Sequence, residues 1–432
     1  MARPSLYSDK QLHKGSLILK GITMKPSNTV THDVHSQKES VITSQKIRVL
    51  LIITGLANGG ATNVVLDIAN YLNDHPDFEV ELLTGPIPDG RHDVTHLAYE
   101  KNIKTTVVPN LVNSINPRLN LMAWLDIRRI MAQGDYDIIH THSSVAGIVG
   151  RLAAVAAGIP VIVHHVHGWG FHQGMAGWIR ALYLNSERFC TLFTSRMIAV
   201  SRPDIQKGLS YRIGNKDKFK LIYNGIELEK FQQPVDELYM RSELGVDPDS
   251  KLVGMIGRLD EQKNPLDFIK VASRVTQEYE NVQFLIVGDG PLRPECEQLI
   301  RDRKLEGKVL LLGYRNDVHK IIPILTLTAM TSLWEGLPIA FLEAMSAGKP
   351  IIANDVDGAS DVVIDGETGF LVTPHQPEEM AVRILTVLYD EMLCSNLGQI
   401  AKNRSASFSI KRMLEQVESL YKELHFAAQV TK

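Results

Sequence analysis

From Ile47 onward the chain alternates short apolar runs with stretches whose apolar positions follow a helical period. Most of the runs end near Gly, Ser, Thr or His, and a helical stretch follows. This alternation predicts parallel strands joined by crossover helices. The predicted strands cover residues 47–54, 79–83, 104–108, 136–140, 160–163, 197–200, 220–223, 252–256, 282–287, 308–311, 327–330, 350–353 and 370–372.

The pattern stops at a polar stretch, residues 232–250, and then starts again. We therefore predict an α/β protein with two doubly wound sheets in tandem, the first domain over residues 47–228 and the second over 229–409. Asn224-Gly225 closes the last strand of the first half, and Pro234 discourages continued regular structure. A final helix over 410–425 is expected to dock on another surface, the first domain being a candidate, because its apolar residues share one face. These are Met413, Val417, Leu420, Tyr421 and Leu424.

Residues 1–46 lack any sustained apolar period and contain seven Lys or Arg against three acids. This composition predicts a disordered extension. No apolar stretch is long and unbroken enough to predict a membrane span, since Arg151, Gly158 and Pro160 interrupt the best one.

Charge and cysteine content exclude several classes of protein. With 46 Lys plus Arg against 49 Asp plus Glu, the net charge is −3, which disfavours nucleic acid as a partner. The three cysteines, Cys190, Cys296 and Cys394, are too few and too scattered for a disulfide framework or a thiolate metal site. A cytoplasmic location is expected.

Two acids flank a predicted helix start in the second half. Glu335 lies in the loop after strand 327–330, and Glu343 lies inside the helix that is expected to begin near Leu337 or Pro338. A loop carboxylate can face a sugar, and a helical carboxylate can accept hydrogen bonds from both hydroxyls of a ribose. The helix start offers N–H groups to a phosphate. Solvated acids are an equally good interpretation of this spacing alone.

Arg258 and Lys263 lie on the loop after strand 252–256, at the edge of a parallel sheet where ligands bind. Together they can neutralise a diphosphate and support its departure. The alternative is a solvated loop in which Asp260 or Glu261 pairs with these cations.

In their order and spacing, several motifs resemble the donor half of the retaining glycosyltransferases of family four, which have two Rossmann-like domains facing a cleft (GT-B type). The resemblance rests on Gly257-Arg258-Leu259 with Lys263, residues 287–292, residues 312–318, and Glu335 with Glu343. It extends into the first half through Gly59-Gly60-Ala61, residues 140–144, residues 167–172 and residues 223–226, so it covers about 47–425.

The resemblance implies a role for each matching residue. Arg258 and Lys263 would bind the donor diphosphate, with the helix start at Leu337 beside it, and Glu343 would hold the ribose. Glu335 and His167 would contact the transferring sugar near the reacting centre. The loop from Gly313 to Asp317 would meet the nucleobase through its backbone. Gly288 and Gly290 would let the backbone approach the ligand closely, although a Gly-x-Gly by itself more often marks only a tight turn.

The acceptor-side candidates are Gly59, Gly60 and His142, with His140 as a further ambiguous strand-end residue. Thr62 stands where the family commonly has a glutamate, which puts acceptor contacts near this loop in doubt. Asp357 and Asp361 replace a glycine and a glutamate of the family pattern.

No metal site is predicted. His164, His165 and His167 lack a carboxylate or cysteine at ligand spacing. Among the Asp-x-Asp pairs only Asp355 and Asp357 follow a strand end, and such a pair is more often a solvated turn.

We therefore expect a metal-independent, retaining hexosyltransferase that moves a sugar from a nucleoside diphosphate-sugar to a hydroxyl acceptor, in polysaccharide or glycolipid synthesis and without a cofactor. A nucleotide-sugar epimerase of similar fold and a non-catalytic nucleotide-sugar binding protein are the alternatives. The apolar and basic segment 118–131 leaves open a lipid-linked acceptor and peripheral contact with the inner face of the membrane, although a buried crossover helix explains it as well.

Overall fold

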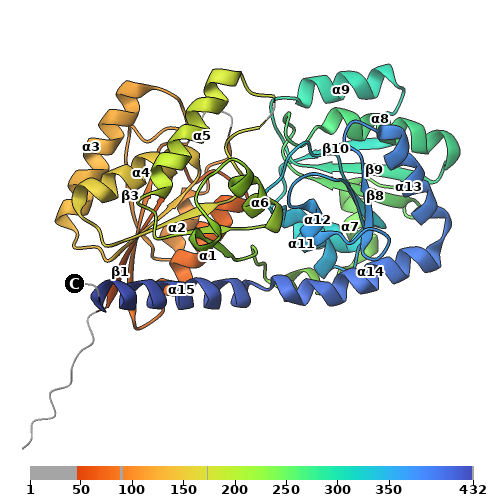
Figure 1. Ribbon diagram of the computed structural model, residues 1–432. Helices are drawn as coiled ribbons and strands as arrows, with labels where there is room; N and C mark the ends of the chain where they lie inside the picture. Colours follow the sequence, from red (N-terminus) through yellow and green to blue (C-terminus); the bar gives the residue numbers. More distant parts are fainter. Residues whose placement is uncertain (1–45, 88–90, 173, 431–432) are drawn as a thin grey trace, which may run out of the picture. The chain divides into compact units, whose positions relative to one another are not determined.

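The computed structural model describes residues 46–87, 91–172 and 174–430. Within them lie two sheets, and every strand pair in both sheets is parallel (Figure 1). The first has the strand order β3-β2-β1-β4-β5-β6-β7 and the second β10-β9-β8-β11-β12-β13. In each sheet the order reverses beside the first strand, as in doubly wound α/β folds, so the two-sheet prediction is confirmed.

The first sheet and the elements that connect its strands span residues 47–231. In chain order they are β1 (Ile47–Ile53), α1 (Gly60–Asn73), β2 (Phe78–Thr84), α2 (Thr95–Glu100), β3 (Lys104–Val107), α3 (Pro117–Gln133), β4 (Ile138–His142), α4 (Ser144–Ala157), β5 (Val161–Val166), α5 (Gly177–Thr191), β6 (Arg196–Ala199), α6 (Arg202–Ser210), η1 (Lys216–Lys218), β7 (Phe219–Leu221) and η2 (Leu228–Phe231).

The second sheet and the C-terminal helices follow. They are α7 (Glu237–Leu244), β8 (Lys251–Ile256), α8 (Pro265–Glu278), β9 (Val282–Val287), α9 (Arg293–Asp302), β10 (Val309–Gly313), α10 (Val318–Ile321), η3 (Ile322–Ile324), β11 (Leu327–Met330), α11 (Ile339–Ser346), β12 (Ile351–Asn354), α12 (Ala359–Val362), β13 (Gly369–Val372), α13 (Pro377–Tyr389), α14 (Glu391–Ser405), η4 (Ala406–Phe408) and α15 (Ile410–Val430).

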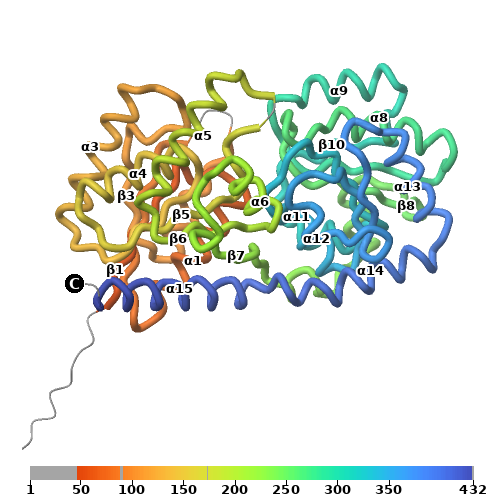
Figure 2. The backbone as a smooth tube through the Cα atoms, in the orientation of Figure 1, coloured from red at the N-terminus to blue at the C-terminus, as the bar shows by residue number. Residues whose placement is uncertain are grey.

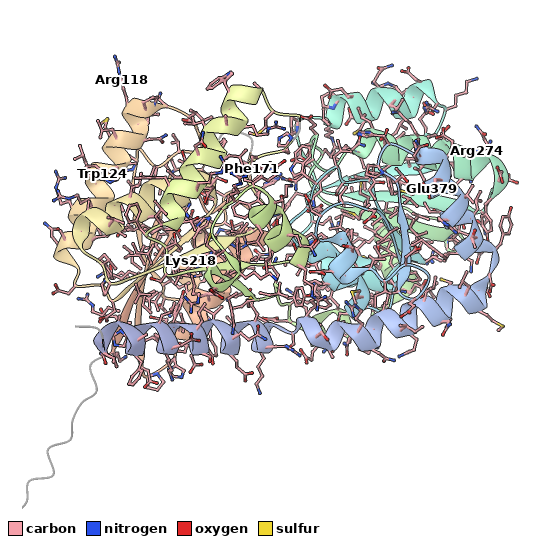
Figure 3. All side chains as sticks on the ribbon, viewed as in Figure 1. Arg118, Trp124, Phe171, Lys218, Arg274 and Glu379 are labelled. Atoms are coloured by element: carbon pink, nitrogen blue, oxygen red, sulfur yellow. The ribbon has the colours of Figure 1, made fainter. Side chains whose placement is uncertain are left out.

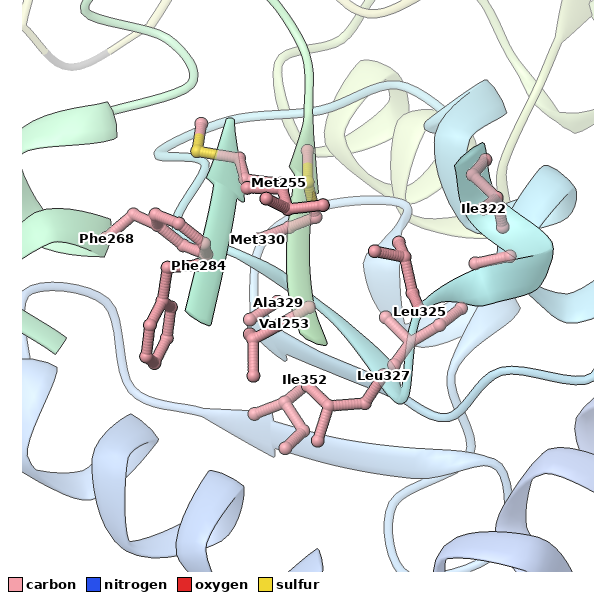
Figure 4. Close-up of a cluster of buried hydrophobic side chains, with 14 of the residues drawn as sticks. Val253, Met255, Phe268, Phe284, Ile322, Leu325, Leu327, Ala329, Met330 and Ile352 are labelled. Carbon is pink, nitrogen blue, oxygen red and sulfur yellow. The ribbon is translucent and has the colours of Figure 1, made fainter. Parts of the chain in front are cut away.

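The second sheet is buried by apolar side chains from its strands and helices. Figure 4 shows Val253 of β8, Ala329 of β11 and Ile352 of β12 in one cluster, with Phe284 of β9 and Phe268 of α8 at its side. The two phenylalanine rings meet edge to face, with their centroids 5.6 Å apart. Strands buried in this way read as continuous apolar runs, which is why the sequence revealed them.

The last helix, α15, covers the first sheet rather than the second (Figures 1 and 2). All five apolar residues of its predicted face are buried: Met413, Val417, Leu420, Tyr421 and Leu424. The segment that leads into α15 crosses the segment that follows β7. There the Ile226 amide donates to the Phe408 carbonyl, and the Ile410 amide donates to the Ile226 carbonyl. The helix also continues beyond the predicted end, to Val430.

Several predicted strands differ from the observed ones by one or two residues at an end, and the two errors that affect the site concern histidines. β4 ends at His142 rather than at residue 140, and β5 continues to Val166 rather than ending at 163. Histidine normally marks the polar end of a strand, but these side chains are buried, and burial lowers the pKa of His140 to about 3. Neutral imidazoles therefore extend both strands into the interior.

Candidate active site

The loops at the carboxyl ends of the two sheets meet at backbone contact. A Cβ added to Gly336, which precedes α11, would lie 2.2 Å from the His167 carbonyl oxygen after β5. Gly168 has φ +113°, a conformation that favours glycine, and an added Cβ there would lie 3.3 Å from the Gly336 Cα. These glycines bring His167 and Glu335 from different sheets into one site.

Lys263 and Glu335 form the central ion pair of this site. The Lys263 ammonium bonds the Glu335 carboxylate, whose side chain is only 6% exposed. Their loops are joined nearby, because Gln262 donates to the Trp334 carbonyl and the Leu333 amide donates to the Gln262 carbonyl. The pair therefore holds the Lys263 ammonium near the end of β8, next to Glu335, the residue expected to contact the sugar.

Arg258 lies on the same loop and pairs with Asp260 at 2.6 Å. This is the Arg–Asp pair that the sequence offered as the alternative to a ligand. The Arg258 side chain remains 35% exposed, so it can still meet an anion. Arg91, which sequence reasoning missed, lies near it: burial and then the positive charge of Arg258 lower the pKa of Arg91. In the sequence, Arg91 stands out only as a basic residue in the loop after the second predicted strand.

Gly288 and Gly290 are required by the packing of one loop on another. An added Cβ at Gly288 would lie 1.9 Å from the Gly257 carbonyl oxygen, and one at Gly290 would lie 2.5 Å from that of Leu259. The glycines thus position the loop that carries Arg258, a reason different from the close ligand approach expected from the sequence. Gly313 has φ +67°, and its carbonyl accepts from the Gly288 amide at 2.8 Å.

Helix α11 begins at Ile339, slightly later than predicted, with Pro338 before it. Leu337 is buried, and its carbonyl accepts a hydrogen bond from the Asn224 side chain of the first half. Glu343 lies in the middle of the helix, and burial raises the pKa of its carboxyl to about 7, with Lys230 opposing the shift. A ribose diol could compensate this burial by donating to the carboxylate.

The acceptor-side candidates have different surroundings. An added Cβ at Gly60 would lie 3.0 Å from Ile339 of α11, so the starts of α1 and α11 approach each other closely, whereas Gly59 has more space. Thr62, in the first turn of α1, is buried and donates to the carbonyl of Ala57 in the loop before that helix. His142 is also buried, and its Nδ1 lies 2.9 Å from Nε2 of His167. It therefore reaches the site through His167 rather than through an exposed surface.

Aromatic stacks also join loops from the two halves. The rings of His172 and Trp334 are stacked with centroids 4.3 Å apart, and those of His92 and Tyr314 are stacked at the same centroid distance. Tyr314 belongs to the loop expected to meet the nucleobase. Neither pairing could be read from the sequence, because each joins residues far apart in the chain.

The departures from the family pattern at residues 357 and 361 become ion pairs between the halves. Lys207 of α6 lies 3.2 Å from the Asp357 carboxylate, and Asp361 accepts from the Arg202 amide at 2.6 Å. Asp361 thereby caps the first turn of α6.

Two family models match this chain. Residues 58–230 match the one described as Glycosyltransferase Family 4, and residues 237–404 match the one described as Glycosyl transferases group 1. Among curated proteins, an Escherichia coli UDP-Gal:alpha-D-GlcNAc-diphosphoundecaprenol alpha-1,3-galactosyltransferase is 30% identical over 352 residues, which cover 80% of this chain and 89% of that protein. The putative glycosyltransferase EpsD of Bacillus subtilis is 28% identical over 70% of this chain and 80% of its own length.

Solved structures share the fold. Anabaena HepE in complex with UDP and glucose superposes with a TM-score of 0.76 at 24% identity, covering 87% of this chain and 100% of that one. WaaG, a glycosyltransferase involved in lipopolysaccharide biosynthesis, has a TM-score of 0.70 at 16% identity, covering 86% and 99%. The E. coli relative and WaaG are named as glycosyltransferases and EpsD as a putative one, and none of these names supports an epimerase. The chain therefore belongs to the family 4 glycosyltransferases and has their GT-B fold of two Rossmann-like domains.

Proposed function

We propose that this glycosyltransferase moves a hexose, with retention of configuration, from a nucleoside diphosphate-sugar to a hydroxyl of a lipid-linked acceptor. Uridine is the first nucleoside to test, because the E. coli relative is named for UDP-Gal and HepE was solved with UDP. The name of that relative also specifies a diphosphoundecaprenol acceptor, which supports a role in polysaccharide or glycolipid synthesis.

The observation that carries the proposal is the Lys263–Glu335 pair beside Arg258. We infer that a donor diphosphate displaces Asp260 from Arg258 and binds both cations. Glu335 would then keep Lys263 oriented while facing the sugar, and Glu343 would accept the ribose hydroxyls. Positive charge fixed around the leaving group stabilises the charge that develops as it departs.

In the proposed front-face reaction, the bond from the anomeric carbon to the diphosphate oxygen breaks as the bond to the acceptor oxygen forms. The acceptor approaches from the side that the diphosphate leaves, and its hydroxyl proton passes to a departing phosphate oxygen. Glu335 and the loop of His167 would position the sugar. No protein nucleophile is required, so electrostatic stabilisation of the diphosphate is the main demand on the chain.

Replacing Lys263 tests this assignment. Lys263→Ala should lower kcat/KM for transfer from a UDP-hexose to a diphosphoundecaprenol-linked sugar by about 10- to 150-fold, the equivalent of a charged hydrogen bond. Arg258→Ala should have a similar effect. Circular dichroism and the melting temperature should show a folded protein in both cases.

Lys270→Ala is the matched control, because Lys270 lies on the adjacent helix α8, has a side chain that is 43% exposed and also pairs with a carboxylate, that of Asp267. It should keep transfer within about twofold of the wild-type rate. Unchanged turnover in Lys263→Ala would contradict the diphosphate site. Donor binding without turnover by the wild-type protein, across a panel of donors and acceptors, would favour the non-catalytic alternative.

We also propose that transfer needs no divalent ion at the diphosphate. Asp357, one of the two carboxylates placed for such an ion, is paired with Lys207 at 3.2 Å, while Arg258 and Lys263 already supply positive charge. Transfer should therefore persist in EDTA and should not rise on addition of Mg²⁺ or Mn²⁺. Complete loss on chelation with recovery on Mg²⁺ would show that the cations are insufficient and would implicate Asp355 and Asp357.

Contact with a membrane surface is the last part of the proposal. No helix within the described residues is long and apolar enough to cross a membrane. Helix α3, however, is only partly the buried crossover helix that its sequence suggested. Leu121, Met122 and Leu125 are 46–57% exposed. At helical spacing they follow Arg118, which projects from the first turn of α3 in Figure 3. Such a stripe can lie in the interface of an anionic membrane that carries the acceptor.

A further inference from the structure

Four histidines are gathered on one face of the first sheet, beneath α15. Parallel pairing places His142 of β4 opposite His165 of β5. His140 precedes His142 by two residues, and His167 follows His165 by two, so alternation turns all four toward the same side. Adjacent rings along each strand have centroids 4.1 Å apart. Ligand nitrogens of His140, His142 and His165 lie within 4.8 Å of one another.

The cluster contains more buried nitrogen atoms than the surrounding protein can pair. Nε2 of His140, Nε2 of His142, both ring nitrogens of His165 and Nδ1 of His167 have no hydrogen-bond partner among the described residues. An unpaired buried donor or acceptor costs about 1–3 kcal/mol. Several unpaired nitrogen atoms this close together therefore indicate that another species, an ion or water, completes the cluster.

The nitrogens that do have partners are placed as in the outer shell of a metal site. Nδ1 of His140 and the hydroxyl of Tyr421 share a hydrogen bond at 2.5 Å, and Nδ1 of His142 lies 2.9 Å from Nε2 of His167. Both contacts use Nδ1 and leave Nε2 of His140 and Nε2 of His142 without a partner among the described residues. Histidines that bind metals commonly use one ring nitrogen as the ligand and donate the other N–H to a neighbour that fixes the ring.

We propose that His140, His142 and His165 form a binding site for a transition-metal ion of the class that imidazole prefers, with Zn²⁺ as the test ion. The donor set is nitrogen only, which suits Zn²⁺, Cu or Ni rather than Mg²⁺ or Ca²⁺. Metal ligands must also be neutral, and burial lowers the pKa of all three imidazoles.

Binding requires only a small rearrangement of the rings. Three nitrogens bound tetrahedrally to Zn²⁺ at about 2.0–2.1 Å would be about 3.3 Å apart. In the structure the ligand nitrogens lie within 4.8 Å of one another, so side-chain rotations must bring them closer together. A fourth position remains for water.

The ion would also fix the proton on the neighbouring His167. With Nε2 of His142 on the metal, its Nδ1 carries the proton and donates to Nε2 of His167. The proton of His167 then lies on Nδ1. The site therefore goes beyond the proposed transferase function, and it contacts the transferase site through a single hydrogen bond.

Metal content tests the proposal directly. The full chain should be produced without an affinity tag in Zn²⁺-supplemented cells, and zinc measured by mass spectrometry. We expect about one Zn²⁺ per chain, and X-ray absorption should show about three imidazoles at about 2.0–2.1 Å. His165→Asn should lose the zinc. His164→Asn is the matched control, since His164 is the buried neighbour on the opposite face and bonds Thr141 at 2.9 Å.

Wild-type protein with less than about 0.1 zinc per chain, or a His165→Asn variant with undiminished zinc, would overturn the site and leave buried water as the occupant. If His165→Asn does not fold, the absorption spectrum of the wild-type protein decides, because coordination without imidazole contradicts the proposal. Lys263→Ala should retain the zinc, so failure of this proposal and failure of the transferase assignment are separable.

Discussion

At the scale of single residues, Glu343 shows how burial creates a demand that a ligand can meet. Its carboxyl lies in the middle of α11 with a pKa raised by burial to about 7. Without a ligand the carboxyl is therefore neutral below about pH 7. A ribose diol would favour the ionised form by donating two hydrogen bonds.

Donor binding should therefore depend on pH. Between pH 8 and pH 6 the Kd for UDP-glucose should rise about tenfold, because the donor must displace a proton from Glu343 below pH 7. Isothermal titration calorimetry can measure this change, and the diphosphate diester of the donor has no ionisation of its own in that range. Glu343→Gln should bind more weakly and with little dependence on pH.

The raised pKa of Glu343 also determines how the stability of the fold depends on pH. Folded Glu343 retains its proton between pH 4.5 and about pH 7, where the unfolded chain has lost it. The contribution of this group to the free energy of unfolding should therefore fall as pH rises through that window.

A Kd that is independent of pH in the wild-type protein would contradict the placement of ribose at Glu343.

At the scale of elements, the active site depends on two loops crossing at backbone contact. Gly336 leads into α11, and its absent side chain leaves room for the His167 carbonyl. Because the obstructing atoms are backbone, they cannot move aside without separating the loops.

Gly336→Ala should therefore lower kcat/KM by more than about tenfold and destabilise the fold by about 1–3 kcal/mol, as overpacking does. Thermal denaturation and steady-state kinetics measure the two effects. Gly177→Ala is the control, because an added Cβ there meets no atom within 4 Å. A Gly336→Ala enzyme with wild-type activity would show that the loop crossing is not needed for transfer.

At the scale of the whole molecule, the first half carries the surface proposed to meet a membrane. The exposed stripe of α3 combines apolar and basic side chains, and Arg128 lies over the Trp124 ring at 6.0 Å from its centroid. Apolar insertion and attraction to anionic lipid would act together, and only the second weakens with salt.

Sedimentation with lipid vesicles tests this surface. The wild-type chain should bind phosphatidylglycerol vesicles more strongly than phosphatidylcholine vesicles, and less strongly in high salt. Leu121→Glu with Leu125→Glu should reduce binding by about tenfold or more and leave transfer to a soluble acceptor intact. Val382→Glu on α13, where Val382 is 60% exposed, should bind like wild type. Equal sedimentation of the α3 variant would exclude this stripe.

The sequence by itself determined the strands and the two-sheet fold. Every strand from β1 to β13 was predicted, because most of them are buried and therefore need a local apolar run, and because their turn residues are local too. The loop cations and the acids near α11 were also visible, since parallel sheets gather ligands at one edge and the order of motifs is a property of the chain.

Only the tertiary structure decided which of these residues meet. Lys263 pairs with Glu335, 72 positions away, and His140 with Tyr421, 281 positions away. The histidines read as strand ends became a buried cluster because α15 returns over the first sheet. Such contacts depend on crossing angles and on which helix covers which face, and these follow from the packing of the whole chain rather than from any local pattern.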